Sequence, residues 1–192
     1  AMVGLDQRGL DAAELTEPGR AFGAYLPAGH AGEALVGAAA AYTSTLTVPG
    51  GATLPHAAVT GVGVLPTYRR RGILTALMRA QFADIAARGE TVATLRASEA
   101  VIYSRFGYGI AGSHTPARID LRRTDIRPFP ESGHVRLFDP DSPLRQRLHA
   151  DTRQPGAITR YPAWWRSREL RDQQSAAHRY LAVHSTAGID DG

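Results

Sequence analysis

Apolar positions alternate along the first half of the chain in a pattern that predicts a β-sheet, and then the period changes. The predicted strands are residues 21–26, 34–42 together with 44–48, 57–64 and 91–96. Between the last two, apolar side chains recur every three or four residues from Leu74 to Ile85, which predicts a helix that begins after Gly72 and ends at Gly89. The order strand, loop, helix, strand predicts a βαβ crossover within an otherwise hairpin-connected sheet.

The second half of the chain has weaker patterns. Ser98 is placed to cap a short helix over residues 99–105, which Gly107 would end. Further elements are predicted as a strand at 117–121, a linker around 127–133, a strand at 135–138, a helix at 144–150 and a strand at 178–184. The tail at 188–192 is predicted as a turn with no returning strand. Trp164 and Trp165 suit packing between domains better than a ligand platform.

Composition excludes several classes of protein. The chain has 192 residues, enough for one domain or one domain and part of another, and 43% of them are hydrophobic, enough for a core. Cysteine is absent, which excludes disulfides and thiolate chemistry, and the seven histidines are scattered, so we expect no metal. No run of residues suits a membrane span or a secretion signal, and we therefore expect a cytoplasmic protein.

The basic residues raise the question of an acidic partner. All 22 are Arg, and the formal net charge is +4. A high GC content of the gene explains the lack of Lys better than a functional need does. The absence of Lys excludes Schiff-base chemistry. A nucleic-acid binder is a third-ranked hypothesis, because the charges are spread along the chain and aromatic residues are only 7%.

The densest charge lies in the stretch PTYRRRGI, residues 66–73, at the start of the predicted helix. The first N–H groups of a helix are unpaired and carry the positive end of its dipole, and a glycine there lets a ligand approach the main chain. Residues 70–74, with the Thr75 hydroxyl, are therefore predicted to form a seat for phosphates. A solvated loop that merely starts a helix explains the same residues about equally well.

The strand before this loop contains Gly63, between Val62 and Val64. An interior glycine often marks a bulge, and a sheet that opens there leaves a strand edge able to hydrogen-bond an amide-bearing ligand. Coenzyme A joins a pantetheine arm, which carries amides, to a pyrophosphate. An amide-binding edge followed directly by a phosphate seat fits this molecule better than a nucleoside triphosphate, for which the P-loop Lys is missing.

Two stretches resemble a known family. Residues 62–74, VGVLPTYRRRGIL, resemble the acetyl-CoA motif of the GCN5-related N-acetyltransferases (GNAT), and residues 97–109, ASEAVIYSRFGYG, resemble their Eis (enhanced intracellular survival) branch. The resemblance implies an α/β (α+β) GNAT fold, with a mixed central sheet and helices on both faces. It also implies an N-terminal acetyl-CoA-binding domain at 1–127 and the start of a second GNAT-like domain at 128–192.

The resemblance further implies roles for individual residues. The residues implied to bind acetyl-CoA are Val62, Gly63, Val64, Arg69, Arg70, Arg71, Gly72, Ile73, Leu74, Thr75, Ser98 and Glu99. Tyr103 matches the tyrosine that acts as general acid, whereas Tyr108 is interpreted as structural and Glu99 as a weaker candidate base. The implied function is transfer of an acetyl group to a primary amine of the aminoglycoside, polyamine or lysine type, in a homohexamer. A non-catalytic acyl-CoA-binding module is the alternative.

Overall fold

The computed structural model describes residues 15–27, 33–113, 115, 120, 122, 133–173 and 179–191. The chain divides into two compact units, which are described separately: residues 1–98 with 152–176, and residues 99–151 with 177–192. The expected domain boundary at residue 127 lies outside the described residues. So does the predicted strand at 117–121, apart from Asp120.

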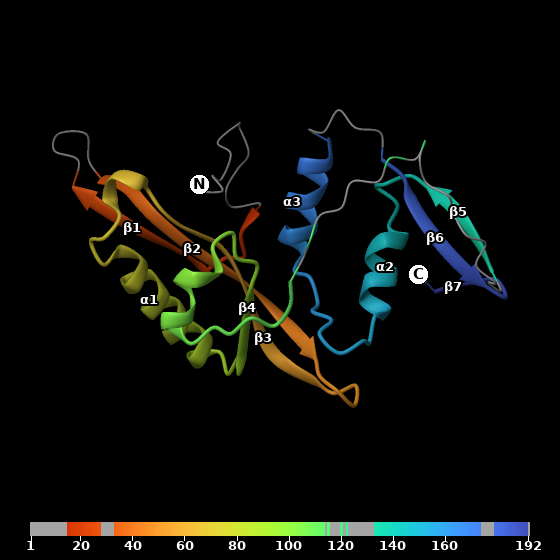
Figure 1. The fold of residues 1–192 in the computed structure, drawn as a ribbon, viewed down its shortest axis with the longest axis horizontal. Coiled ribbons are helices and arrows are strands. Elements are labelled where there is room, and N and C mark those ends of the chain that lie inside the picture. Colours follow the sequence, from red (N-terminus) through yellow and green to blue (C-terminus); the bar gives the residue numbers. More distant parts are fainter. Residues whose placement is uncertain are drawn as a thin grey trace. The chain divides into compact units, whose positions relative to one another are not determined.

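The first unit is built on a four-stranded sheet (Figure 1). Its strands are β1 (Ala21–Pro27), β2 (Glu33–Thr47), β3 (Thr53–Val64) and β4 (Val92–Leu95), in that spatial order. The first three are antiparallel neighbours, and β4 lies parallel to β3 after a crossover through helix α1 (Ile73–Ala87). The predicted α/β fold, with a mixed sheet and a βαβ crossover, is confirmed.

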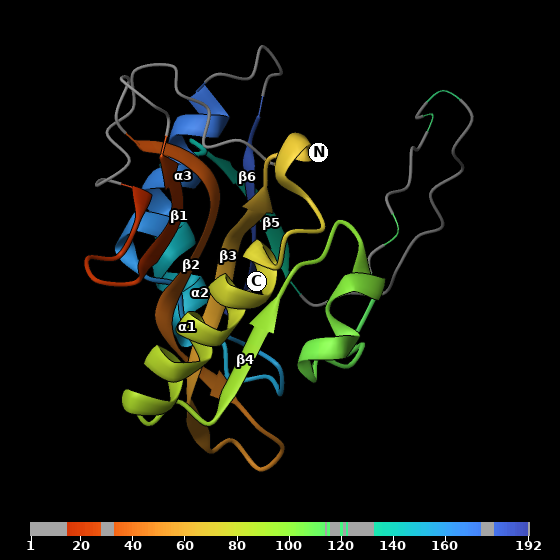
Figure 2. The same cartoon turned by 90° about the vertical axis from the view of Figure 1, so that its left-hand side faces the viewer.

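Helix α1 covers one face of this sheet (Figure 2). Its predicted apolar stripe is confirmed, since Leu77, Met78 and Ile85 are buried. Ile85 belongs to a core that also contains Ala41, Ala57 and Val59 of the sheet. The helix ends as the sequence predicts, because Gly89 follows it with a left-handed φ of 71°. No helix among the described residues is long and apolar enough to cross a membrane.

The outer edge of β2 is satisfied by partners from several parts of the chain. Beyond the stretch paired with β1, its alternate N–H groups belong to Ala41, Thr43, Thr45 and Thr47. The main-chain oxygen of Arg20 and the carboxylate of Glu17 accept from the first two. The Thr159 hydroxyl and the Ala157 carbonyl accept from the last two, each at 2.8 Å. An edge that would otherwise template further pairing is thereby closed.

A buried ion cluster holds the segment before β1. The side chain of Arg20 has no exposure to solvent, and its Nη2 donates to Glu90 at 2.7 Å. The same guanidinium lies 3.3 Å from Asp84 of α1 and donates to the Thr43 hydroxyl at 3.0 Å. Burial alone would lower the pKa of Arg20, but the bond to Glu90 and the neighbouring carboxylates outweigh it and raise that pKa. Arg20 therefore joins β2, α1 and the start of β4.

His56 of β3 is fully buried and is hydrogen-bonded on both ring nitrogens. Its Nδ1 lies 2.9 Å from the Ser44 hydroxyl, and its Nε2 lies 2.8 Å from that of Thr94. Burial lowers the pKa of His56, Glu90 opposes this, and Arg160 lowers the pKa further. The imidazole is therefore neutral in the folded chain at neutral pH, and its two bonds tie β2, β3 and β4 together.

This histidine gives the first unit a dependence on pH. In the unfolded chain His56 binds a proton near its ordinary pKa of about 6.5. Because the folded pKa is lower, the unfolded state binds more protons as pH falls below about 6.5, and stability decreases. We expect the free energy of unfolding to be level above about pH 7.5 and to fall toward pH 5.5. Urea titrations followed by tryptophan fluorescence measure this, and His56→Asn should flatten the curve; an unchanged slope in that variant would assign the effect to other groups.

The second unit contains a three-stranded sheet of β5 (His134–Phe138), β6 (Leu181–Thr186) and β7 (Ile189–Asp190), with helix α2 (Leu144–Asp151). The predicted strand at 135–138 and helix at 144–150 are confirmed. The prediction of a tail with no returning strand is wrong, because β7 pairs antiparallel with the end of β6. In the first unit, residues 161–165 lie at the start of helix α3 (Pro162–Gln173).

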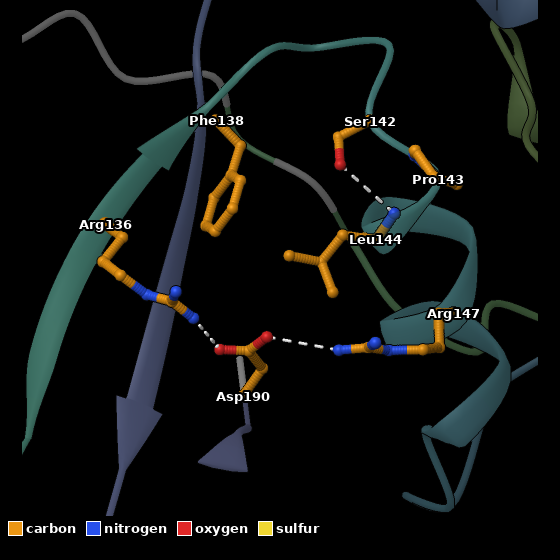
Figure 3. A pocket seen from close by; sticks show the side chains of 7 residues that line it. All are labelled: Arg136, Phe138, Ser142, Pro143, Leu144, Arg147 and Asp190. Atoms are coloured by element: carbon orange, nitrogen blue, oxygen red, sulfur yellow. Dashed lines mark hydrogen bonds and ion pairs between the residues drawn. The ribbon is translucent and has the colours of Figure 1, made fainter. Parts of the chain in front are cut away.

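The second unit also has a pocket of about 410 Å³ between β5, β7 and α2 (Figure 3). Asp190 stands between two guanidinium groups, those of Arg136 and, at 3.2 Å, Arg147, and it accepts from the Ser185 hydroxyl at 2.7 Å. These bonds lower the pKa of Asp190, that from Ser185 most. Phe138 and Leu144 form apolar walls. Asp190 thus bridges the two guanidinium groups, and we interpret the cluster as a brace that joins β5, β7 and α2.

Candidate acetyl-CoA site

β3 pairs with β4 over only part of its length. The parallel register runs from His56 opposite Val92 to Val59 opposite Leu95. Beyond that point, residues 60–64 of β3 have no strand on that side in the part of the chain that the structure describes. The sheet therefore opens at the end of β3, where the sequence predicted a free edge.

A β-bulge accompanies this opening. Ala38 of β2 is opposite Gly63 and Ala40 is opposite Thr60, so two residues of β3 stand against Ala39. The first of them, Gly61, has a left-handed φ of 61°, a conformation that glycine adopts without steric cost. The sequence analysis associated the irregularity with Gly63, whereas the structure places it two residues earlier.

The main chain of Val64 faces the open edge. The N–H of the next residue, Leu65, donates to Val36 of β2 at 2.9 Å. Because successive N–H groups of a strand point to opposite edges, the N–H of Val64 points away from β2. Gly37 lies opposite Val64, and a Cβ there would stand 3.0 Å from the Ile73 side chain. This glycine, which the sequence analysis missed, lets the first turn of α1 lie close to β2 at that level of the sheet.

The predicted phosphate seat follows directly. A short 3-10 turn, Pro66–Tyr68, leads into the three arginines, and Arg70 and Gly72 both have left-handed φ values, of 63° and 78°. Gly72 occupies the N-cap position of α1 and provides no side-chain cap. Within the described part of the chain, the N–H groups of residues 70–75 have no hydrogen-bond acceptor. Main-chain N–H groups beside left-handed residues form concave anion-binding sites, and the helix dipole adds to this one.

The side chains of Arg69, Arg70 and Arg71 are exposed. The Arg71 side chain folds back onto Thr67 and Tyr68, whereas the side chains of Arg69 and Arg70 have no ion-pair or hydrogen-bond partner among the described residues. The first unit thus brings Val62–Val64 and Arg69–Thr75 into one continuous stretch. Ser98 also belongs to this unit, where it is exposed after β4.

Glu99 and Tyr103 belong to the second unit. The predicted short helix over 99–105 is instead two 3-10 turns, Ala100–Ile102 and Ser104–Phe106, and the predicted Ser98 cap is wrong, because Glu99 holds the N-cap position without a side-chain bond. With only three residues each, these turns leave no room for an α-helical hydrogen-bond ladder. Gly107 ends the second turn with a φ of 88°, as predicted.

Tyr103 is 9% exposed and packs edge-to-face on Tyr108, with ring centroids 5.9 Å apart. Burial, and then the negative charge of Glu99, raise the pKa of Tyr103. Burial raises the pKa of Tyr108 to about 12. Tyr103 thus keeps its proton at neutral pH and has one that it can donate.

The described residues contain no group of three or more His, Asp or Glu side chains that could hold a metal ion. Residues 7–111 of the chain match the family described as Acetyltransferase (GNAT) domain. The chain belongs to the GNAT acetyltransferase family.

Individual relatives agree with this assignment. The GNAT chain is 41% identical to an uncharacterised N-acetyltransferase of Streptomyces avermitilis over 158 residues, which cover 78% of this chain and 37% of that protein. It is 45% identical to the N-acetyltransferase Eis of Mycobacterium tuberculosis over 91 residues, which cover 47% of this chain and 23% of Eis. The crystal structure of Eis1 from Mycobacterium abscessus superimposes with a TM-score of 0.78 at 48% identity, covering 96% of this chain and 46% of Eis1.

These comparisons confirm the resemblance to GNAT proteins and to their Eis branch. The GNAT chain spans less than half the length of these relatives, since the alignments cover 37%, 23% and 46% of them. The motif that carried the resemblance, residues 62–74, lies where the sheet opens and α1 begins.

Proposed function

We propose that this chain is the cofactor-binding part of an N-acetyltransferase that transfers an acetyl group from acetyl-CoA to a primary amine. One observation carries the proposal: the free edge of β3 runs directly into a loop whose main-chain N–H groups have no acceptor in the described chain. A ligand that fits must carry amides at one end and phosphates at the other. Acetyl-CoA has both, and the family of the chain supports the assignment.

Binding follows from the chemistry of each part. The pantetheine amides pair with the main chain of Val62–Val64 as an added strand would. The pyrophosphate lies on the N–H groups of residues 70–75, with Arg69 and Arg70 able to reach its outer oxygens. Ser98 and Glu99 flank the cofactor in this proposal. The N–H of Val64, which points to the open edge, stabilises the oxyanion that forms when the amine attacks the thioester.

Tyr103 supplies the remaining step, protonation of the leaving thiolate of CoA. Its pKa is raised by burial and by Glu99, so it is protonated at neutral pH and can act as the general acid. The amine attacks as the neutral base, the carbon–sulfur bond breaks, and the sulfur takes the proton of Tyr103. The nitrogen, positively charged after the attack, loses one proton to solvent, and solvent returns a proton to the Tyr103 phenolate. The acceptor is a primary amine of the aminoglycoside, polyamine or lysine type. The resemblance to the Eis branch leads us to expect a homohexamer, and we place the protein in the cytoplasm in this proposal.

The phosphate seat is tested with Gly72→Ala, measured by calorimetric titration with acetyl-CoA. A Cβ at this left-handed position strains the main chain and occupies the approach to the N–H groups, so we expect affinity to fall by about tenfold. Gly50→Ala is the matched control, because Gly50 also has a left-handed φ, of 91°, and at both glycines an added Cβ meets no atom within 4 Å. The control should bind as the parent does. Equal losses in the two variants would contradict the proposed seat.

Catalysis is tested separately by release of free thiol from acetyl-CoA across a panel of aminoglycosides, polyamines and lysine peptides. The full-length protein should release thiol with at least one acceptor. Saturable acetyl-CoA binding without thiol release for any amine would favour the non-catalytic acyl-CoA-binding module. Absence of saturable binding would overturn both functions.

A further inference from the structure

The three arginines of the loop differ in their surroundings. Arg71 Nη2 lies 3.4 Å from the carbonyl oxygen of Thr67, and the Arg71 guanidinium stands 5.1 Å from the centre of the Tyr68 ring. Arg69 and Arg70 have no such contacts among the described residues. A guanidinium that already rests on an aromatic face and a carbonyl is less available to a ligand phosphate than its two neighbours.

The residue between these contacts has an unusual backbone conformation. Arg70 has a φ of 63°, and the left-handed region is sterically unfavourable for a residue other than glycine. The side chain of Arg71 reaches back across Arg70 to residues three and four positions earlier. The contacts of Arg71 therefore link the residue after Arg70 to residues before it. A strained backbone conformation persists only where surrounding contacts hold it in place.

We propose that Arg71 is a positioning residue. Together with Tyr68 it holds Arg70 in the left-handed conformation that turns the N–H groups of this loop outward. Arg69 and Arg70 are the arginines that contact the phosphates. The inference rests on the proposed function and deepens it, because it divides three adjacent arginines into two roles. An exposed guanidinium–aromatic contact contributes less free energy than a hydrogen bond between charged groups.

The two roles are separated by the salt dependence of acetyl-CoA binding. Arg69→Gln and Arg70→Gln should each weaken binding by about tenfold or more and flatten the plot of log Kd against log salt, because a phosphate contact is lost. Arg71→Gln should weaken binding by only about two- to fivefold and leave the slope unchanged. Arg79→Gln, an exposed charge in the middle of α1, is the control and should match the parent.

The partner of Arg71 gives the decisive comparison. Tyr68→Leu should reproduce the loss seen in Arg71→Gln, and the double variant should lose no more than either single one. Three results would each overturn the positioning role of Arg71: a flattened salt dependence in Arg71→Gln, parental affinity in Tyr68→Leu, or additive losses of affinity in the double variant. If the parent shows no saturable acetyl-CoA binding, the proposed function fails. The positioning role of Arg71 is then tested in the free protein by the Tm of the two single variants and of the double variant. The Tm shift of the double variant must be smaller than the sum of the two single shifts, and additive shifts would reject the positioning role.

Discussion

Replacing Tyr103 with Phe is expected to lower kcat for amine acetylation by about 10²- to 10⁴-fold, the range typical of a lost general acid. The ring stays in place, so its packing on Tyr108 is kept and only the hydroxyl is removed. Because the phosphate seat and the β3 edge are untouched, the Kd for acetyl-CoA should stay at the parental value. Stopped-flow or steady-state thiol release, together with calorimetry, measures the two quantities separately.

Tyr108→Phe is the matched control. Tyr108 is the other member of the ring pair with Tyr103, and its pKa is also raised, to about 12. Tyr108 transfers no proton in the proposed mechanism, so kcat should be unchanged in this variant. The pH profile adds a second check, because a general acid works only below its pKa. Since burial raises the pKa of Tyr103 above its ordinary value of about 10, deprotonation of this tyrosine should cause no alkaline fall in kcat below that pH. Full turnover in Tyr103→Phe would remove the assigned acid.

The sequence predicted α1 and its loop because their signals are local. A helix with an apolar stripe, a glycine at its N-cap and a glycine after its last turn needs no distant residue to be recognised. The same rule predicts that Gly72 precedes the first turn of α1 and leaves its N–H groups without a side-chain cap. In the structure Gly72 is the N-cap residue, and it has no side-chain hydrogen bond to the helix. Part of the family resemblance, that of residues 62–74, is carried by the same stretch, and the resemblance is confirmed.

Other features depend on pairings that the local sequence does not contain. In the run Gly61–Val64, two glycines alternate with valines, and only the register against β2 decides that the bulge is at Gly61. The left-handed Arg70 has no glycine to mark it. β7 was missed because a strand of two residues, Ile189–Asp190, is too short to show alternation.

The 3-10 turns at Ala100–Ile102 and Ser104–Phe106 show the limit of capping rules. Ser98 and Gly107 are placed as the cap and stop of one α-helix, and the glycine indeed ends the segment. The main chain at Glu99 is extended and Tyr103 separates two short turns, so no continuous helix forms between the two signals. A cap residue predicts where a helix can begin, but whether the turns continue depends on contacts elsewhere.

Arg20 is a fully buried charge that no local pattern of the sequence singles out. Its partner Glu90 is 70 residues away in the chain, and the pair is buried, with Asp84 and Glu17 nearby. Arg20→Ala would leave these carboxylates in a largely buried site without their cation. Removal of one partner of a buried ion pair costs about 3–5 kcal/mol, so we expect the free energy of unfolding of the first unit to fall by about that amount.

Urea unfolding followed by tryptophan fluorescence measures this unit, because Trp164 and Trp165 both belong to it and are the two tryptophans of the chain. Arg88→Ala is the control: Arg88 also pairs with Asp84, at 2.9 Å, but it is 39% exposed, and an exposed pair of this spacing contributes only about 0.3–0.5 kcal/mol. Adding Glu90→Gln to Arg20→Ala should restore part of the loss, since the uncompensated charge is removed. The free energies of unfolding of Arg20→Ala and Arg88→Ala could instead differ by less than about 1 kcal/mol, which is less than tenfold in the unfolding constant. That result would mean that the cluster is solvated and does not hold the segment before β1.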